Sequence, residues 1–175
     1  MSGASEFKIE ALDPSKHRRD EFSCESAELT EFLQKRARKE MEARTSACFV
    51  ILPVSDSGRI AGFYTLSATE IVTSGLPEHF TKRLPRYPQL PATLLGRLAR
   101  ESAFRGQGIG DRLMQDALAR AFAGSAEVGS IGVITDPKDR RAEEFYLEYG
   151  FFPLGNSRLF LPMKEIARLL QKKPS

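Results

Sequence analysis

Three glycines lie within five residues in the stretch "RGQGIG", at Gly106, Gly108 and Gly110. Strand-like "ATLLGRLAR" precedes this stretch and an amphipathic helical pattern follows it. A strand, a glycine turn and a helix in this order present unpaired backbone N–H groups at the positive end of a helix dipole, where phosphate binds. Glycine permits positive φ and lets ligand oxygens approach the main chain. The stretch therefore predicts a phosphate-binding loop.

Two familiar phosphate-binding loops do not fit these residues. The stretch lacks the Gly-Lys-Ser/Thr ending of a P-loop, so no lysine and hydroxyl would hold a nucleoside triphosphate with its magnesium. Its glycine spacing also differs from the dinucleotide-binding fingerprint. Taken alone, the turn is compatible with either a structural or a ligand-binding role.

A second group with useful chemistry lies downstream, in "AEEFYLEYGFF", which contains Tyr146 and Tyr149. A phenol has a pKa of about 10, so it can donate a proton at neutral pH while staying protonated at rest. Helical spacing turns neighbouring residues in different directions, and we expect Phe145 to face the core. Either tyrosine is also compatible with simple packing.

Hydrophobic periodicity predicts the elements that must position these groups. Ser26 is expected to cap the first helix, and Gly150 to end the helix that carries Tyr146. In chain order we expect a strand at 7–12, a helix at 27–41, a β-hairpin at 47–71, a proline-rich loop at 74–91, a strand at 92–100, a helix at 109–122, a strand at 130–135, a helix at 140–149, a strand at 158–163 and a helix at 164–173.

Length and composition favour one globular domain with a sizeable core, because the chain has 175 residues of which 41% are hydrophobic. Residues 1–6 resemble a cloning remnant or a disordered start, which leaves 7–172 for the domain. No apolar run approaches the roughly 18 residues of a membrane span, and no signal peptide is evident. Cys24 and Cys48 have no metal spacing. We therefore expect a cytoplasmic protein without a metal and without a membrane partner.

Cations gather in the first quarter of the chain, although the formal net charge is only +3. The stretch "QKRARKE" contains Lys35, Arg36, Arg38 and Lys39 beside acidic residues. Such a run is compatible with a solvated helix face or with an anionic partner. Neither His17 nor His79 fits a motif, so both are expected at the surface.

The stretch from Arg105 to Gly110 resembles the Q/R-x-x-G-x-G/A motif of GNAT acetyltransferases, and "AEEFYLEYGFFPL" resembles the helix-to-strand segment of the same superfamily. More narrowly, "FSCESAELTEFLQKRARKE" followed by "ACFVILPVSDSGRIAGFYTLSA" resembles the GNAT toxins of bacterial type II toxin–antitoxin modules. The resemblance covers most of the chain. It implies an α/β (α+β) GNAT fold, in which helices flank a mixed central β-sheet in a single domain.

The resemblance implies acetyl-CoA as co-substrate. By this likeness, the backbone that pairs with pantetheine is that of Leu98, Ala99 and Arg100, although Arg100 stands where the family usually has an aliphatic residue. The residues implied to hold the pyrophosphate are Arg105, Gly106, Gln107, Gly108, Ile109 and Gly110. Tyr146 matches the catalytic tyrosine that reprotonates the thiolate, with Tyr149 as the competing choice.

For a toxin of this kind, the implied substrate is the α-amino group of aminoacyl-tRNA, and its acetylation blocks translation. An α-amine titrates near 7.7–8.0 against about 10.4 for lysine, so it needs little help from a base. Residues expected to contact the tRNA are Lys35, Arg36, Arg38, Lys39 and Arg97. The alternatives are acetylation of a protein N-terminus, lysine or small amine, and a basic RNA-binding module with a vestigial acetyl-CoA site. The implied partners are a second copy of the chain and an antitoxin, a ribbon-helix-helix DNA-binding protein by resemblance.

Overall fold

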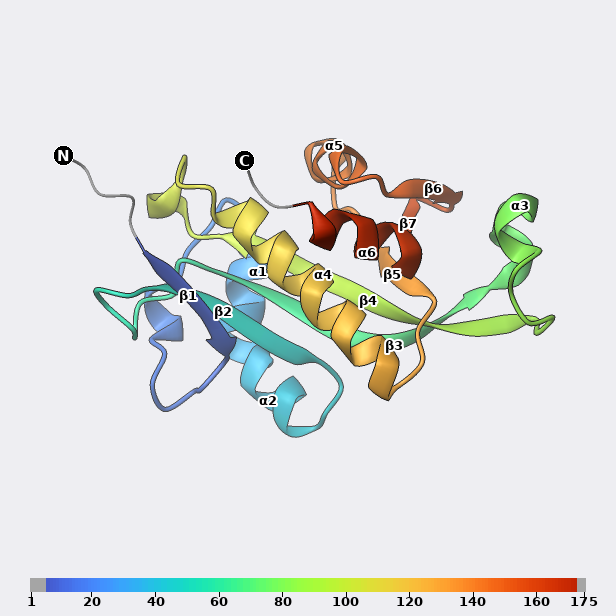
Figure 1. The fold of residues 1–175 in the computed structure, drawn as a ribbon. Coiled ribbons are helices and arrows are strands. Elements are labelled where there is room, and N and C mark those ends of the chain that lie inside the picture. The colour runs from blue at the N-terminus through green and yellow to red at the C-terminus, as the bar shows by residue number, and fades with distance from the viewer. Residues whose placement is uncertain (1–5, 173–175) are drawn as a thin grey trace. The chain divides into compact units, whose positions relative to one another are not determined.

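The computed structural model describes residues 6–172 (Figure 1). The strands are β1 (Phe7–Ala11), β2 (Ala47–Pro53), β3 (Gly62–Val72), β4 (Gln89–Arg100), β5 (Gly132–Thr135), β6 (Phe152–Gly155) and β7 (Arg158–Pro162). The helices are α1 (Ala27–Glu31), α2 (Ala37–Glu42), α3 (Glu78–Thr81), α4 (Ile109–Glu127), α5 (Arg140–Glu148) and α6 (Met163–Gln171). A π-helical turn, η2 (Phe32–Arg36), joins α1 to α2, and 3-10 turns lie at Arg19–Glu21, Thr73–Gly75 and Ser102–Phe104.

Seven strands are hydrogen-bonded in the order β1-β2-β3-β4-β5-β7-β6. The sheet is mixed, because β4 and β5 are parallel whereas β1, β2 and the start of β3 form antiparallel pairs. The chain divides into two compact units. The first contains the described residues up to Ser67 together with Gly96–Ala117, and the second contains Ala68–Leu95 with residues 118–172.

Helices cover both faces of the strands in the first unit (Figure 1). Alternate β2 side chains pack against α1, η2 and α2 in one core, whose members include Phe32, Leu33, Ala37, Cys48, Val50, Leu52 and Phe63. On the other face a Cβ at Gly62 would lie 2.9 Å from the Ile109 side chain. Glycine at that position therefore lets the first turn of α4 approach β3 closely.

The second unit contains the remaining strand pairs, with β7 antiparallel to both β5 and β6. Its core includes Ile71, Leu76, Leu90, Ala92, Ile134 and Phe160. The proline-rich segment is anchored in this core, because Phe80 of α3 packs edge-on against Phe160 with ring centroids 5.6 Å apart. The short strand β6 was absent from the predicted elements, because Pro153 and Gly155 are typical of turns.

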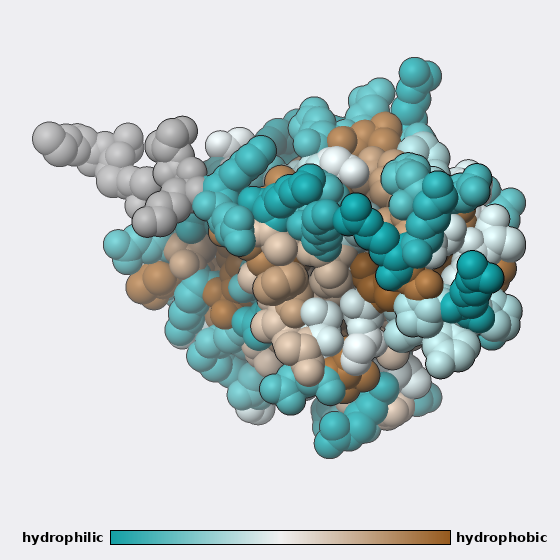
Figure 2. Space-filling view, turned by 45° about the vertical axis from the view of Figure 1, so that its right-hand side comes forward, coloured by the Kyte–Doolittle hydropathy of each residue, from teal (hydrophilic) through white to brown (hydrophobic). Residues whose placement is uncertain are grey.

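Surface polarity varies over the face drawn in Figure 2, where teal hydrophilic residues lie among paler and brown ones. Large hydrophobic side chains that are exposed include Val54, Val72, Tyr87, Phe122, Val128, Leu147 and Leu170. None of the helices within residues 6–172 is long and apolar enough to cross a membrane. Residues 1–5 of the expected cloning remnant lie outside the described part of the chain.

Candidate active site

The glycine loop lies between β4 and α4, as its pattern predicts. Gly106 and Gly108 have φ angles of 79° and 73°. A side chain strains the backbone at such angles, which explains glycine at both positions. A Cβ at either position would meet no atom within 4 Å, so the main chain is open to a ligand. Gly110 lies in the first turn of α4.

Three polar side chains of the first unit meet beside this loop. One carboxylate oxygen of Glu25 accepts a hydrogen bond from Arg105 Nη2 at 2.7 Å and another from Arg100 Nη2 at 3.2 Å. The hydrogen bond from Arg105 and the charge of both guanidinium groups lower the pKa of the Glu25 carboxyl. Glu25 is therefore ionised at neutral pH. Sequence analysis did not select it, because nothing local links it to residues 75 and 80 positions away.

The end of β4 brings the three predicted pantetheine-contacting residues to the same loop. Ala99 is buried in the core of the first unit, while Leu98 and Arg100 are half-buried. Arg100 Nη1 is buried and has no hydrogen-bond partner among the described residues. A buried guanidinium nitrogen is costly to leave unpaired, so Arg100 depends on its contact with Glu25 for charge compensation.

The catalytic candidate Tyr146 lies in the second unit, on α5. Asp139 caps this helix by accepting a hydrogen bond from the Ala142 N–H at 2.8 Å, and Gly150 with φ 97° follows its end. Tyr146 is only 6% exposed. Burial raises the pKa of its phenol, and a hydrogen bond with Thr135 lowers it by less. The phenol therefore stays protonated well above neutral pH.

Thr135 is a neighbour of Tyr146 that sequence analysis missed. Its hydroxyl donates to the Leu95 carbonyl at 3.0 Å and is buried at the end of β5. The hydrogen bond between Thr135 and Tyr146 connects this strand end to the phenol. A threonine at the end of a strand has no sequence signal that distinguishes such a role from β-propensity.

Phe145 was expected to face the core, but it is only half-buried, whereas Tyr146 is buried. Tyr146 packs edge-on against Phe151 with ring centroids 5.5 Å apart, which places it on the inner side of α5. Tyr149 is half-buried and its ring lies 5.3 Å from that of Phe145. The two candidate tyrosines therefore differ in burial.

The predicted cations of the first helix form an exposed surface, although they are not equivalent. Lys35, Arg36, Arg38 and Lys39 are all exposed. Arg38 donates to Glu42 at 2.8 Å. Arg36 and Arg97 meet on one aromatic ring, since their guanidinium carbons lie 5.3 Å and 3.7 Å from the centroid of Phe32.

The π-helical turn η2 contains both Phe32 and Arg36. An inserted π turn shifts the side chains that follow it around the helix, a device common at functional sites. Arg97 also lies 4.0 Å from Glu40, so it is positioned from two sides. Both guanidinium groups therefore lie close to the buried Phe32 ring, and guanidinium groups suit phosphate contacts.

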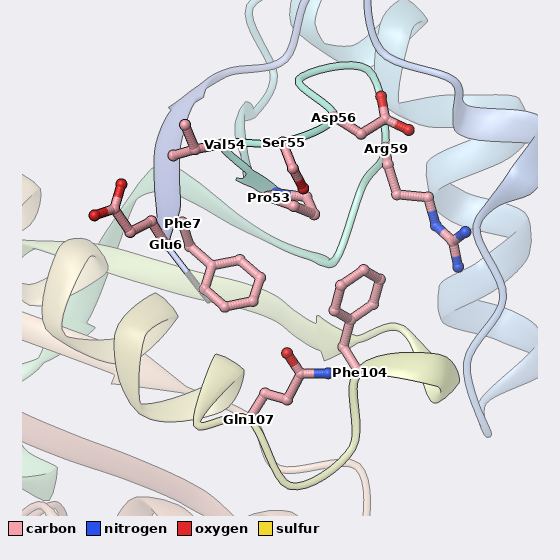
Figure 3. Close-up of a pocket in the computed structure, with 9 residues that line it drawn as sticks. All are labelled: Glu6, Phe7, Pro53, Val54, Ser55, Asp56, Arg59, Phe104 and Gln107. Carbon is pink, nitrogen blue, oxygen red and sulfur yellow. The ribbon is translucent and has the colours of Figure 1, made fainter. Parts of the chain in front are cut away.

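A pocket of about 700 Å³ adjoins the glycine loop within the first unit, lined in part by Gln107 and Phe104 (Figure 3). The rings of Phe7 and Phe104 lie edge to face at its wall, with centroids 6.1 Å apart. Arg59 lies over Phe104, 5.3 Å from its centroid. Aromatic rings therefore form part of the lining of this pocket beside the glycine loop.

The histidines and Cys48 show no sign of a catalytic role. His17 is buried, contrary to expectation, since its Nδ1 accepts from the Asp13 N–H at 2.9 Å and its Nε2 lies 2.7 Å from Glu10. His79 is exposed as expected. Burial raises the pKa of the Cys48 thiol to about 12, so that thiol is inert at neutral pH. Residues 6–172 contain no cluster of His, Cys, Asp and Glu that could hold a metal ion.

The chain is similar to known proteins over most of its length. The chain is 32% identical over 178 residues to "Probable toxin TacT" of Sinorhizobium fredii, covering 97% of this chain and 98% of the relative. It is 28% identical over 151 residues to a "tRNA-acetylating toxin" of Mycobacterium tuberculosis, covering 85% of this chain and 88% of the relative.

Several solved structures have a similar fold. AtaT complexed with acetyl-methionyl-tRNAfMet superimposes with a TM-score of 0.87 at 25% identity, covering 95% of this chain and all of that one, 100%. A tyrosine-to-phenylalanine mutant of KacT gives 0.86 at 26% identity, covering 93% and 98%. AtaTR bound with AcCoA gives 0.82 at 27% identity, covering 94% and 98%.

The mixed seven-stranded sheet flanked by helices matches the fold of these structures. The model of the acetyltransferase (GNAT) family matches residues 12–151, which is most of the chain. On this match and on the full-length relatives, the chain belongs to the acetyltransferase (GNAT) family.

Proposed function

We propose that this protein is a toxin that uses acetyl-CoA to acetylate the α-amino group of aminoacyl-tRNA and thereby inhibits translation. The observation that carries this proposal is the similarity, over nearly the whole chain, to "Probable toxin TacT". The resemblance to AtaT complexed with acetyl-methionyl-tRNAfMet supports the same substrate class.

Acetyl-CoA fits the residues at the glycine loop. The open main chain at Gly106 and Gly108 leaves room for a pyrophosphate, and the amino end of α4 supplies N–H groups for its oxygens. Arg105 adds a positive charge, while Gln107 and Ile109 complete the loop. The end of β4, at Leu98, Ala99 and Arg100, offers backbone groups for the pantetheine amides.

Bound acetyl-CoA supplies a thioester, whose carbonyl carbon the neutral α-amine attacks. The amine–carbon bond forms as the carbon–sulfur bond breaks, and the departing thiolate takes a proton from the Tyr146 phenol. Burial keeps that phenol protonated until this step. The α-amine titrates near 7.7–8.0, so a fraction is neutral without a protein base. The amine nitrogen becomes positively charged as it attacks, and it loses one proton to solvent to leave a neutral amide, while the phenolate regains a proton from solvent.

Five cations would hold the phosphates of tRNA: Arg36 and Arg97, whose guanidinium groups lie near Phe32, and the exposed Lys35, Arg38 and Lys39. Contacts of this kind position nucleic acid without reading its sequence. Selection of a particular aminoacyl-tRNA therefore requires other residues.

The same proposal includes the setting in which the enzyme acts. A protein that acetylates tRNA works in the cytoplasm, and likeness to named toxins supports a cognate antitoxin. We further propose residues 7–172 as one functional domain, a homodimer as the active assembly, and a ribbon-helix-helix protein as the antitoxin.

A translation extract supplied with radiolabelled acetyl-CoA tests the proposal. After incubation the RNA is extracted and hydrolysed with base, and the label is expected on an amino acid released from tRNA. The Tyr146→Phe variant is the matched control, with its labelling strongly reduced. Label found only on protein would instead favour a GNAT enzyme acting on a protein N-terminus or lysine.

A further inference from the structure

The carboxylate of Glu25 binds two guanidinium groups beside the glycine loop. The bond from Arg105 measures 2.7 Å and the bond from Arg100 measures 3.2 Å, both to the same oxygen. Glu25 precedes α1, Arg100 ends β4 and Arg105 begins the glycine stretch. All three residues belong to the first unit.

The two arginines differ in how much they need this carboxylate. The Arg105 side chain is 68% exposed, so water can solvate its charge when the contact breaks. The Arg100 side chain is only 19% exposed, and its Nη1 has no hydrogen-bond partner among the described residues. Losing Glu25 is therefore costly for Arg100 and cheap for Arg105.

A phosphate and a carboxylate compete for the same guanidinium donors, because the planar guanidinium fork can donate charge-assisted hydrogen bonds to the anionic oxygens of either group. Arg105 is adjacent to Gly106, whose open main chain would receive the pyrophosphate. An anion on this loop would therefore compete for Arg105 with the Glu25 carboxylate, which lies 2.7 Å from Arg105 Nη2.

We propose that Glu25 competes with the phosphates of acetyl-CoA for Arg105. When acetyl-CoA binds, its phosphates take the place of Glu25 at Arg105, and Glu25 stays bound to Arg100. This inference rests on the proposed use of acetyl-CoA. Glu25 is thus a residue that sets cofactor affinity, and its carboxylate raises the dissociation constant for phosphate-bearing ligands. The alternative role is structural, in which Glu25 only fastens the start of α1 to the loop.

The two roles predict opposite signs for one substitution. If Glu25 competes, Glu25→Gln should lower the Kd for CoA by about two- to fivefold, the range expected of an exposed ion pair. If Glu25 only fastens the loop, the same change should raise that Kd. S-acetylpantetheine, which has no phosphate, should bind both proteins equally if competition is the cause.

Isothermal titration of the full chain with CoA and with S-acetylpantetheine tests this directly. We expect tighter CoA binding for Glu25→Gln, weaker binding for Arg105→Gln, and little further effect of Glu25→Gln when Arg105 is already Gln. Glu28→Gln is the matched control, because Glu28 is an exposed acid on α1 whose loss changes the net charge equally. It should leave the CoA affinity unchanged.

Equal or weaker CoA binding by a folded Glu25→Gln protein would overturn the inference, and so would an equal gain for S-acetylpantetheine. Should Glu25→Gln fail to fold, Glu25→Asp keeps the charge on a shorter side chain and should tighten CoA binding less. Failure of the wild-type protein to bind CoA at all would refute the proposed function instead, so the two failures are distinguishable.

Discussion

The glycine loop and the surroundings of Tyr146 are opposite in character. The loop is exposed, has backbone at positive φ and lies beside charged groups, including Arg105 and Glu25. Tyr146 is buried, neutral and linked only to a hydroxyl, that of Thr135, among the partners that influence its pKa. A site that receives an anion from water must stay open to it, whereas a proton donor benefits from an environment that suppresses ionisation.

The largest effect on binding is expected from placing charge and bulk on the open glycine loop, because this removes the property that distinguishes the loop from the surroundings of Tyr146. Gly108→Asp puts a carboxylate where a pyrophosphate would lie and forces a side chain to φ 73°. We expect acetyl-CoA binding to be abolished while the fold survives, since a Cβ there meets no atom within 4 Å. Calorimetry would measure the binding, and the strain should cost about 1–3 kcal/mol of stability.

Gly124→Asp is the matched control, because Gly124 also has open space around its Cβ but lies within α4 away from the glycine stretch. It should leave the acetyl-CoA affinity unchanged. Unchanged affinity in Gly108→Asp would mean that the cofactor binds elsewhere.

The second change acts on the buried side of the contrast. Tyr146→Phe keeps the ring that packs against Phe151 but removes the hydroxyl that is the proposed proton donor. We expect kcat to fall by about 10²-fold or more, with the Kd for acetyl-CoA nearly unchanged. Steady-state kinetics with charged tRNA and calorimetry separate the two quantities. Full activity here together with an inactive Tyr149→Phe protein would transfer the role to Tyr149.

The third change is made at the exposed cations that are proposed to contact tRNA. Replacing Lys35, Arg36 and Lys39 by glutamate should raise the KM for charged tRNA by about tenfold or more and flatten its dependence on salt, because fewer counterions are released on binding. Acetyl-CoA affinity should barely change. The same residues replaced by glutamine should give a smaller effect of the same sign. Unaltered tRNA kinetics in both variants would identify the cluster as a solvated helix face.

The smallest expected effect concerns Thr135, whose hydrogen bond partly offsets the rise in the pKa of Tyr146. Thr135→Val should raise that pKa further and destabilise the protein by about 1–3 kcal/mol, since the Leu95 carbonyl loses its partner. Spectrophotometric titration of the phenols, compared with Tyr146→Phe, would detect the shift. Thr93→Val is the control on the neighbouring strand and should leave the Tyr146 titration unchanged.

The sign of the pH dependence follows from the same burial. In the proposed mechanism Tyr146 acts in its protonated form, and its pKa is raised above the ordinary value of 10.0. Activity that depends on this phenol should therefore show no alkaline decline until the pH exceeds about 10. Its contribution to stability is fully present below that pH and is lost as the pH rises further, because the unfolded chain ionises first. A decline in kcat with a midpoint near pH 8 would implicate another group.

Local sequence patterns predicted most of the elements and the glycine loop. An apolar, β-branched run identified β2, and an extended pattern after a turn signal identified β3. Ser26 caps α1 as expected by accepting from the Leu29 N–H at 3.2 Å, and positive φ occurs at Gly106 and Gly108. These features depend on residues within a turn or two of one another, so the chain's chemistry determines them locally. Resemblance to GNAT toxins then supplied the cofactor and substrate class.

Only the tertiary structure decided which distant side chains meet. It placed Glu25 beside Arg105, Arg97 and Arg36 near the ring of Phe32, and Thr135 at the phenol of Tyr146. It also buried His17 against Glu10, where isolated sequence gave no motif. Contacts between residues far apart in the chain depend on how strands and helices pack, and hydrophobic periodicity specifies the packed faces but not the polar partners between them.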